Sequence, residues 1–263
     1  MEKIMNGKVA LITGGGTGLG AAIARRFSKN GASVVLTGRR EAPIQAIAQE
    51  TGGRAVAGDV TDNEHLKQAV QTAVDEFGGL DIVVANAGII TMAEVLSLDN
   101  QDWQTMIDIN LTGVMNTARA AISAMIKRGG GSIVNISSVA GLMGVNEAVG
   151  YCTTKSALSG LTRSLAMDYG AQKIRVNALC PGWFKSEMSD MEMNELAKEK
   201  NISFEDAVKR VTQYLPLKRM ADADEIAACV EFLASDNSSF ITGTTLVADG
   251  GGSIVDVGMI GFL

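Results

Sequence analysis

A tyrosine and a lysine near the middle of the chain have a spacing suited to proton transfer. Tyr151 and Lys155 stand four residues apart, and Tyr151 follows Ser138 by thirteen residues. Residues at i and i+4 share one face of an α-helix, so the phenol and the ammonium group can lie together. A free tyrosine has a pKa of about 10, and a neighbouring cation favours the phenolate. Such a pair is chemically suited to acid–base catalysis, but taken alone it is better interpreted as an ordinary exposed pair on a helix.

A glycine-rich segment follows the first predicted strand and leads into a helical stretch. Glycines permit positive φ and a close approach of the backbone, and the free N–H groups at a helix N-terminus favour a pyrophosphate. A turn of this kind between the first strand and the first helix of an α/β chain is typical of a dinucleotide site. The residues expected to contact the dinucleotide are Gly14, Thr17, Gly18, Leu19 and Gly20.

The second predicted strand ends in Gly38-Arg39-Arg40, where an acidic residue would bind the ribose hydroxyls of NAD. No acid stands there. Gly38 leaves space, and Arg39, with Arg40, offers a planar guanidinium to a 2′-phosphate. We therefore predict NADP(H) as the cofactor rather than NAD(H). The alternative interpretation is a solvated basic turn.

Short apolar, β-branched runs alternate along the 263 residues with longer stretches of helical period. This alternation predicts an α/β fold with a parallel sheet. No low-complexity tract, charge block or repeat interrupts it, so we expect one domain over residues 1–263. The seven predicted strands are Lys8–Thr13, Ser33–Thr37, Ala55–Ala57, Asp81–Ala85, Ser132–Ser137, Arg175–Leu179 and Thr244–Ala248.

The stretch between Ser186 and Leu217 is too long for an ordinary connection between strands. It is rich in methionine and charge, and Ser203 and Asp206 have the spacing of a helix cap. We expect an inserted helical flap over about residues 187–217, above the substrate. Three of its methionines could form an adaptable apolar lid or pack within the flap: Met188, Met191 and Met193.

The chain has a single histidine, His65, which argues against hydrolytic triads and many metal sites. Because His65 flanks the apolar stripe of a helix that Asp62 caps, we expect its side chain to face solvent. The three cysteines have no Cys-x-x-Cys spacing and indicate neither a zinc site nor a redox dithiol. We therefore expect reduced thiols, a cytoplasmic location and no metal.

The charge balance and the hydropathy exclude further classes of function. The net charge is −6 and the pI about 4.9, so no basic excess is available for a nucleic-acid backbone. No apolar run is long enough to span a bilayer, and Met1 to Lys8 has no signal-peptide core. We expect no nucleic-acid partner and no membrane contact.

The glycine turn, the segment Asn86-Ala87-Gly88 and the spacing of Ser138, Tyr151 and Lys155 together resemble the short-chain dehydrogenase/reductase family, in its compact one-domain branch. The resemblance runs from Lys8 to about Gly251. It implies a Rossmann-like, doubly wound seven-stranded sheet and hydride transfer between a nicotinamide cofactor and a ketone or secondary alcohol.

The resemblance also implies roles for individual residues. Tyr151 would be the general acid in reduction and the general base in oxidation. Lys155 would hold the nicotinamide ribose and favour the tyrosinate, and Ser138 would bind the substrate oxygen. Asn110 would anchor a water relay. This set explains how the chain could work without a catalytic histidine.

The family pattern implies further cofactor contacts. Two departures from it appear: Ala85 replaces a frequent asparagine, and Ser186 replaces the usual threonine but keeps the hydroxyl. The residues carried over are Asp59 and Val60 at the adenine, Asn86, Ala87 and Gly88 on the cofactor floor, and Pro181, Gly182 and Ser186 at the carboxamide.

The substrate is less well defined by the sequence. The span from Cys180 into the flap is similar to 3-hydroxybutyrate and gluconate dehydrogenases, but Ile90, Ala140 and Ala148 stand where polar residues would hold a carboxylate. We therefore expect a small, neutral carbonyl compound. Glu147 could meet a hydroxyl or cationic group of the substrate, or lie solvated in its loop.

Three rival functions stay open: a 3-oxoacyl-carrier-protein reductase, a sugar or hydroxy-acid dehydrogenase, and a sensor that binds NADP(H) without turnover. The intact proton-transfer residues favour an enzyme over a sensor. The apolar tail Ile254–Leu263 would be costly to expose, so we expect it at a subunit interface of a homotetramer, as in family tetramers.

Overall fold

The computed structural model describes residues 3–262 and contains one seven-stranded parallel sheet. The strand order is β3-β2-β1-β4-β5-β6-β7, as expected of a doubly wound Rossmann-like sheet. Each observed strand overlaps a predicted one. Their bounds are Val9–Thr13 (β1), Ser33–Gly38 (β2), Arg54–Ala57 (β3), Ile82–Ala85 (β4), Gly131–Ile136 (β5), Ile174–Pro181 (β6) and Thr245–Ala248 (β7).

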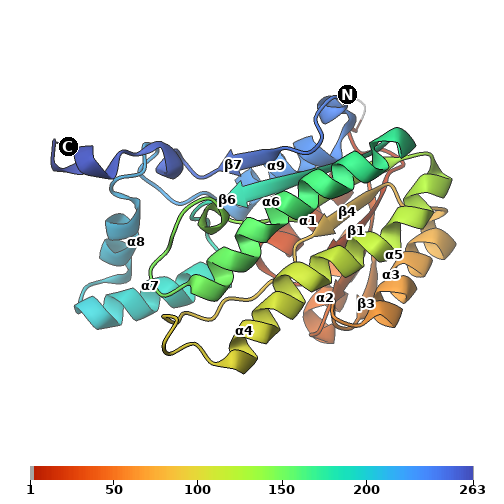
Figure 1. The fold of residues 1–263 in the computed structure, drawn as a ribbon. Helices are drawn as coiled ribbons and strands as arrows, with labels where there is room; N and C mark the ends of the chain where they lie inside the picture. Colours follow the sequence, from red (N-terminus) through yellow and green to blue (C-terminus); the bar gives the residue numbers. More distant parts are fainter. Residues whose placement is uncertain (1–2, 263) are drawn as a thin grey trace.

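Helices cover both faces of this sheet (Figure 1). One face is covered by α1 (Gly18–Lys29), α2 (Glu41–Thr51) and α9 (Ala223–Ala234). The other face is covered by α3 (Asn63–Phe77), α5 (Gly113–Arg128) and α6 (Val149–Tyr169). Three further helices lie beyond these two layers: α4 (Asn100–Ile107), α7 (Glu187–Lys200) and α8 (Phe204–Thr212).

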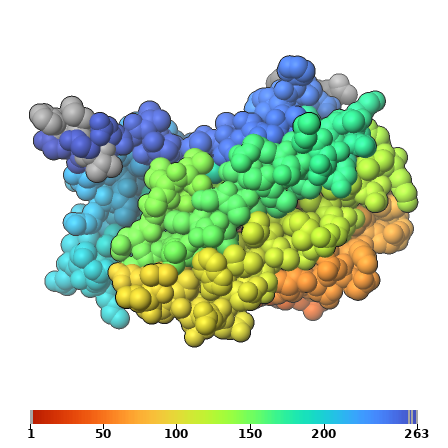
Figure 2. All heavy atoms as spheres, viewed as in Figure 1, coloured from red at the N-terminus to blue at the C-terminus, as the bar shows by residue number. Residues whose placement is uncertain are grey.

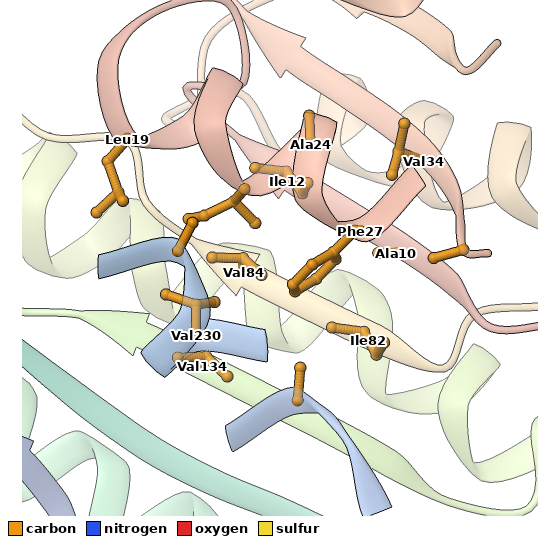
Figure 3. Packing of buried hydrophobic residues seen from close by; sticks show 14 of the residues in the cluster. Ala10, Ile12, Leu19, Ala24, Phe27, Val34, Ile82, Val84, Val134 and Val230 are labelled. Carbon is orange, nitrogen blue, oxygen red and sulfur yellow. The ribbon is translucent and has the colours of Figure 1, made fainter. Parts of the chain in front are cut away.

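The central strands are buried on both faces, which explains their continuous apolar runs. In β1, Ala10 and Ile12 point to the cluster under α1 and α9, whereas Val9 and Leu11 point to the cluster under α3 and α5. Figure 3 shows the first cluster, with Phe27 of α1 packed over β1 and β4 beside α9. The two-sided core holds the carboxyl ends of the strands in a fixed register.

The predicted flap contains two helices with serine caps. Ser186 accepts a hydrogen bond from the Ser189 backbone N–H at the start of α7, and Ser203 accepts one from that of Asp206 at the start of α8. Figure 2 shows the flap as a lobe at one end of the molecule, beside the C-terminal segment. Among residues 3–262, no helix has the length and apolar character needed to cross a membrane.

The expectation that His65 faces solvent is wrong. Asp62 caps α3 as predicted, but the His65 side chain is only 6% exposed and forms a hydrogen bond with the Thr37 hydroxyl. The ring fits there because Gly58 has no side chain; a Cβ at that position would overlap the imidazole. A polar ring can be buried when it has a hydrogen-bond partner, and periodicity alone does not reveal that partner.

Candidate active site

Four neighbouring strands lead directly into predicted site residues. β1 leads into the glycine turn, β4 into Asn86-Ala87-Gly88, β5 into Ser137-Ser138, and β6 ends at Pro181 before Gly182. Because these parallel strands are adjacent in the order β1-β4-β5-β6, their carboxyl ends lie along one edge of the sheet. Ligands of open α/β sheets bind at this edge.

The glycine turn is tied to the end of β4. The Asn86 side-chain amide donates to the carbonyls of Thr13 at 3.0 Å and Gly14 at 3.2 Å, and the Thr13 hydroxyl accepts from the backbone of Asn86 and Ala87 at 3.0 Å each. A Cβ on Gly20 would collide with the Gly14 carbonyl, so a larger residue would break this packing. The close contacts explain Gly14 and Gly20, while Gly18 has φ of +51°.

The start of α1 leaves its amide groups available to a ligand. Thr17 occupies the N-cap without a side-chain capping bond, and the first turn carries no acidic residue. Backbone N–H groups at such a helix start attract phosphate. Together with the glycine turn, this geometry fits the pyrophosphate of a dinucleotide.

Both predicted phosphate-binding arginines are exposed at the end of β2. Arg39 Nε lies 4.0 Å from an oxygen of Asp59, and Arg40 donates to the Thr17 hydroxyl at 3.3 Å. Arg40 also lies 3.9 Å from the carboxylate of Glu187, the first residue of α7. Arg40 thus links the end of β2 to the glycine turn and to the start of the flap.

Tyr151 and Lys155 lie together on α6, as their spacing predicts. The Lys155 ammonium lies 5.5 Å from the centre of the Tyr151 ring and donates to the Ile136 carbonyl at 2.9 Å. Burial lowers the pKa of Lys155 to about 8. A Cβ on Gly88 would lie 3.4 Å from this ammonium and 3.3 Å from Asn110 Oδ1, so the absence of a side chain at Gly88 leaves room for both polar groups.

In the protein without ligands, the pKa of the Tyr151 phenol is raised, whereas the sequence pattern predicts that the nearby lysine lowers it. Burial raises the pKa of Tyr151 to about 12, and the hydrogen bond with Ser138 opposes this rise only in part. Desolvation therefore dominates the pKa of this phenol, and the nearby Glu192 raises it further. At neutral pH Tyr151 carries its proton, which is the form that donates to a carbonyl oxygen.

Asn110 lies in a π-helical turn, Asp108–Thr112, between α4 and α5. Its buried side chain accepts from the Ile89 N–H and donates to the Ile89 carbonyl, both at 2.8 Å, and reaches the Thr154 hydroxyl at 3.2 Å. Asn110 therefore joins the segment after β4 to the catalytic helix. The predicted water relay stays a prediction.

Two positioning residues were not singled out by the sequence reasoning. Ser137 is buried and donates to the Lys155 carbonyl at 2.9 Å, which fixes α6 against β5. Thr13 holds β4 as described above. Their only signal in the sequence is their position beside Ser138 and Gly14, because either hydroxyl could equally have faced solvent.

The start of the flap lies over the glycine turn. The Ser186 Cβ is the only group within 4 Å of a Cβ placed on Gly18, at 3.8 Å, among the residues that the structure describes. Ser186 also forms the cap of α7, so its hydroxyl has a structural role besides the predicted one at the carboxamide. Two further residues predicted to contact the cofactor are buried: Val60, which follows β3, and Pro181, which ends β6.

The flap methionines divide between the two interpretations. Met193 is 2% exposed and packs with Trp183 and Phe204, so it belongs to the core of the flap. Met188 and Met191 are 42% and 67% exposed and stay candidates for a lid. Within the described residues, no group of three or more His, Cys, Asp or Glu side chains is placed to hold a metal ion.

Known proteins match this chain over most of its length. A family model described as Enoyl-(Acyl carrier protein) reductase matches residues 14–253. Trans-4-hydroxycyclohexanecarboxylate dehydrogenase of Sinomonas cyclohexanicum is 42% identical over 255 residues, which cover 93% of this chain and 92% of that one.

Two solved structures have nearly the same fold. The crystal structure of levodione reductase has a TM-score of 0.90 at 33% identity and covers 95% of this chain and 99% of its own. L-Sorbose reductase from Gluconobacter frateurii, complexed with NADPH and L-sorbose, has a TM-score of 0.89 at 30% identity, covering 95% and 98%.

Proposed function

Because the chain belongs to the short-chain dehydrogenase/reductase family, it is an oxidoreductase of CH–OH groups that uses a nicotinamide cofactor, and we propose that it is NADP(H)-dependent and interconverts small neutral ketones and secondary alcohols. The observation that carries this proposal is the group formed by Tyr151, Lys155 and Ser138 beside the glycine turn.

Each residue of this group has a separate role in the proposed reduction. A bound reduced nicotinamide supplies a hydride to the substrate carbonyl carbon. Ser138 orients the carbonyl oxygen, and Tyr151 donates its proton to that oxygen as negative charge develops. Lys155 provides a cation beside the phenolate that remains, which offsets the cost of charging a buried phenol.

Several observations support a neutral substrate. Ala140 and Ala148 are buried beside the catalytic helix, and neither they nor Ile90 offer a charge or a side-chain hydrogen bond to a carboxylate. The names of both structural neighbours refer to uncharged carbonyl compounds, whereas the relative from Sinomonas cyclohexanicum is named for a hydroxy acid, so the test must include keto acids. We propose that the flap, residues 187–217, covers such a substrate.

The test is NADPH oxidation with a panel of neutral ketones, diketones, ketoses, 2- and 3-keto acids and an acyl-carrier thioester. Highest kcat/KM with a neutral ketone or ketose supports the proposal. Preference for the acids or for the thioester would instead make the chain a hydroxy-acid dehydrogenase or a carrier-protein reductase. Tight NADPH binding without turnover of any compound would indicate a sensor.

Replacing Arg39 by aspartate tests the cofactor preference. We expect the Kd for NADPH to rise about 30- to 300-fold, because a guanidinium–phosphate pair is replaced by like charges, while the Kd for NADH changes less than about threefold. Both are measured by fluorescence titration. Arg54→Asp, which breaks an exposed ion pair with Glu76, is the matched control. Unchanged preference in Arg39→Asp would exclude the assigned role.

We also propose a homotetramer in the cytoplasm. Phe240 and Met167 are almost fully exposed, and Val247 is partly exposed on the edge strand β7. Apolar surface of this kind is typical of subunit contacts. The three cysteines are free thiols, which is consistent with a reducing compartment.

Deleting residues 258–263 tests the role of the tail. Ile254 is 81% exposed where the tail begins, so we expect a covering subunit there and a smaller oligomer after truncation. Light scattering of the full chain and of the truncated protein at equal concentration measures the mass. An unchanged mass would mean that the tail is not part of the interface.

A further inference from the structure

The only histidine of the chain lies beneath the adenosine end of the proposed cofactor site. His65 belongs to the first turn of α3, and its buried ring forms a hydrogen bond with the hydroxyl of Thr37 near the end of β2. Thr37 is fully buried as well. Neither residue belongs to the proton-transfer group, so the mechanism leaves this pair unexplained.

Thr37 connects His65 to the glycine turn. The Thr37 carbonyl accepts a hydrogen bond from the Gly15 N–H at 3.2 Å, while its side chain meets the imidazole. Gly38 and Arg39 follow directly. The position of Thr37 therefore affects both the turn proposed to bind the pyrophosphate and the arginine proposed to bind the 2′-phosphate.

The His65 ring also packs against Gly58, directly after the end of β3. The imidazole occupies the space that a Gly58 side chain would fill, and the Gly58 N–H donates to the Gly38 carbonyl at 3.1 Å. Asp59 follows, held by the backbone N–H and the hydroxyl of Thr61 at 2.9 Å each. His65 thus sets the spacing of the two strand ends that carry Arg39 and Asp59.

We propose that His65 is a positioning residue for the adenosine half of the cofactor, acting through Thr37 and Gly58 without touching the cofactor. The inference rests on the proposed NADP(H)-binding function. An imidazole suits this place because it fills the gap over a glycine and also pairs the Thr37 hydroxyl. An apolar side chain of similar volume would leave that hydroxyl buried and unpaired.

The experiment compares His65→Leu, His65→Gln, Thr37→Val and the double variant His65→Leu/Thr37→Val. In the two single variants that break the pair, His65→Leu and Thr37→Val, we expect the KM for NADPH and the Kd for 2′,5′-ADP to rise together by about 5- to 30-fold. The kcat at saturating NADPH stays within about twofold. His65→Gln, whose amide can still pair Thr37, recovers part of the loss.

The double variant distinguishes loss of the hydrogen bond between His65 and Thr37 from a general loss of stability. Both single substitutions break one shared hydrogen bond, so the double variant should bind 2′,5′-ADP no more weakly than the weaker single variant. Ser132→Ala is the control, because it removes a buried hydrogen bond to the Leu233 carbonyl elsewhere in the sheet. It should lower Tm without changing the KM for NADPH.

Two results would overturn the proposal. One is a loss of Tm in His65→Leu with the KM for NADPH and the Kd for 2′,5′-ADP both unchanged. The other is additive weakening of 2′,5′-ADP binding in the double variant. If His65→Leu does not fold, Thr37→Val and His65→Gln decide the question alone. Failure of the proposed function itself would show in the wild-type protein, as absence of NADPH binding or turnover.

Discussion

Tyr151→Phe is expected to lower kcat for ketone reduction by at least about 10³-fold while leaving the Kd for NADPH within about twofold. The phenol carries the proton at neutral pH because burial raises the pKa of Tyr151 to about 12. Phenylalanine keeps the ring and its packing beside Lys155 but has no proton to donate. Steady-state kinetics and fluorescence titration of NADPH measure the two effects.

A second tyrosine on the same helix provides the control. Tyr169 ends α6 and packs against the cluster beneath α3 and α5, away from the glycine turn. Tyr169→Phe should leave kcat within about twofold. If Tyr151→Phe kept more than a tenth of the wild-type kcat, Tyr151 would not be the proton donor.

Lys155→Met is expected to abolish turnover and at the same time to stabilise the ligand-free protein. At neutral pH the wild-type lysine is charged although it is buried, and this desolvation lowers its pKa from 10.5 to about 8. Methionine has a similar length and no charge. We expect relief of this desolvation to raise the free energy of unfolding by about 1–3 kcal/mol at about pH 7. Loss of the hydrogen bond to the Ile136 carbonyl offsets part of this gain.

The sign of the pH dependence follows from the same shift. Between the folded pKa of about 8 and the unfolded value of 10.5, the unfolded chain binds more protons than the folded one. The stability that Lys155 costs is therefore recovered as pH rises through this window. The advantage of Lys155→Met should be largest at and below about pH 7, should shrink from about pH 8 upward, and should be nearly gone above pH 10.5.

Urea denaturation of both proteins across this pH range measures the difference. Lys127→Met is the control, because Lys127 is exposed on α5 and its loss should give a small, pH-independent change. A Lys155→Met protein that is less stable than wild type at neutral pH, or a difference that does not vary with pH, would contradict the desolvation argument.

The predicted stability cost of Lys155 also bears on its proposed function. A cost of this kind is expected where a buried group stabilises charge that appears only during reaction, which in the proposed mechanism is the phenolate formed when Tyr151 donates its proton.

Most of the fold, and the arrangement of Tyr151 and Lys155 in the proposed site, could be predicted from the chain without coordinates. The strand and helix order, the cap at Asp62, the flap helix after Ser203 and the shared face of Tyr151 and Lys155 all depend on local periodicity and turn chemistry. Adjacency of the strand ends follows from the parallel α/β alternation. These features need only neighbours within a few residues or a well-established topology.

Other features depend on residues far apart in the chain, and only the folded arrangement decides them. His65 is buried because Thr37 and Gly58 form a place for it, and Ser186 of the flap lies beside Gly18 across more than half of the sequence. The pKa of Tyr151 rises rather than falls, because burial of the phenol removes water and the hydrogen bond with Ser138 compensates only in part. Burial and long-range contact are collective properties of the packed chain, so no local pattern specifies them.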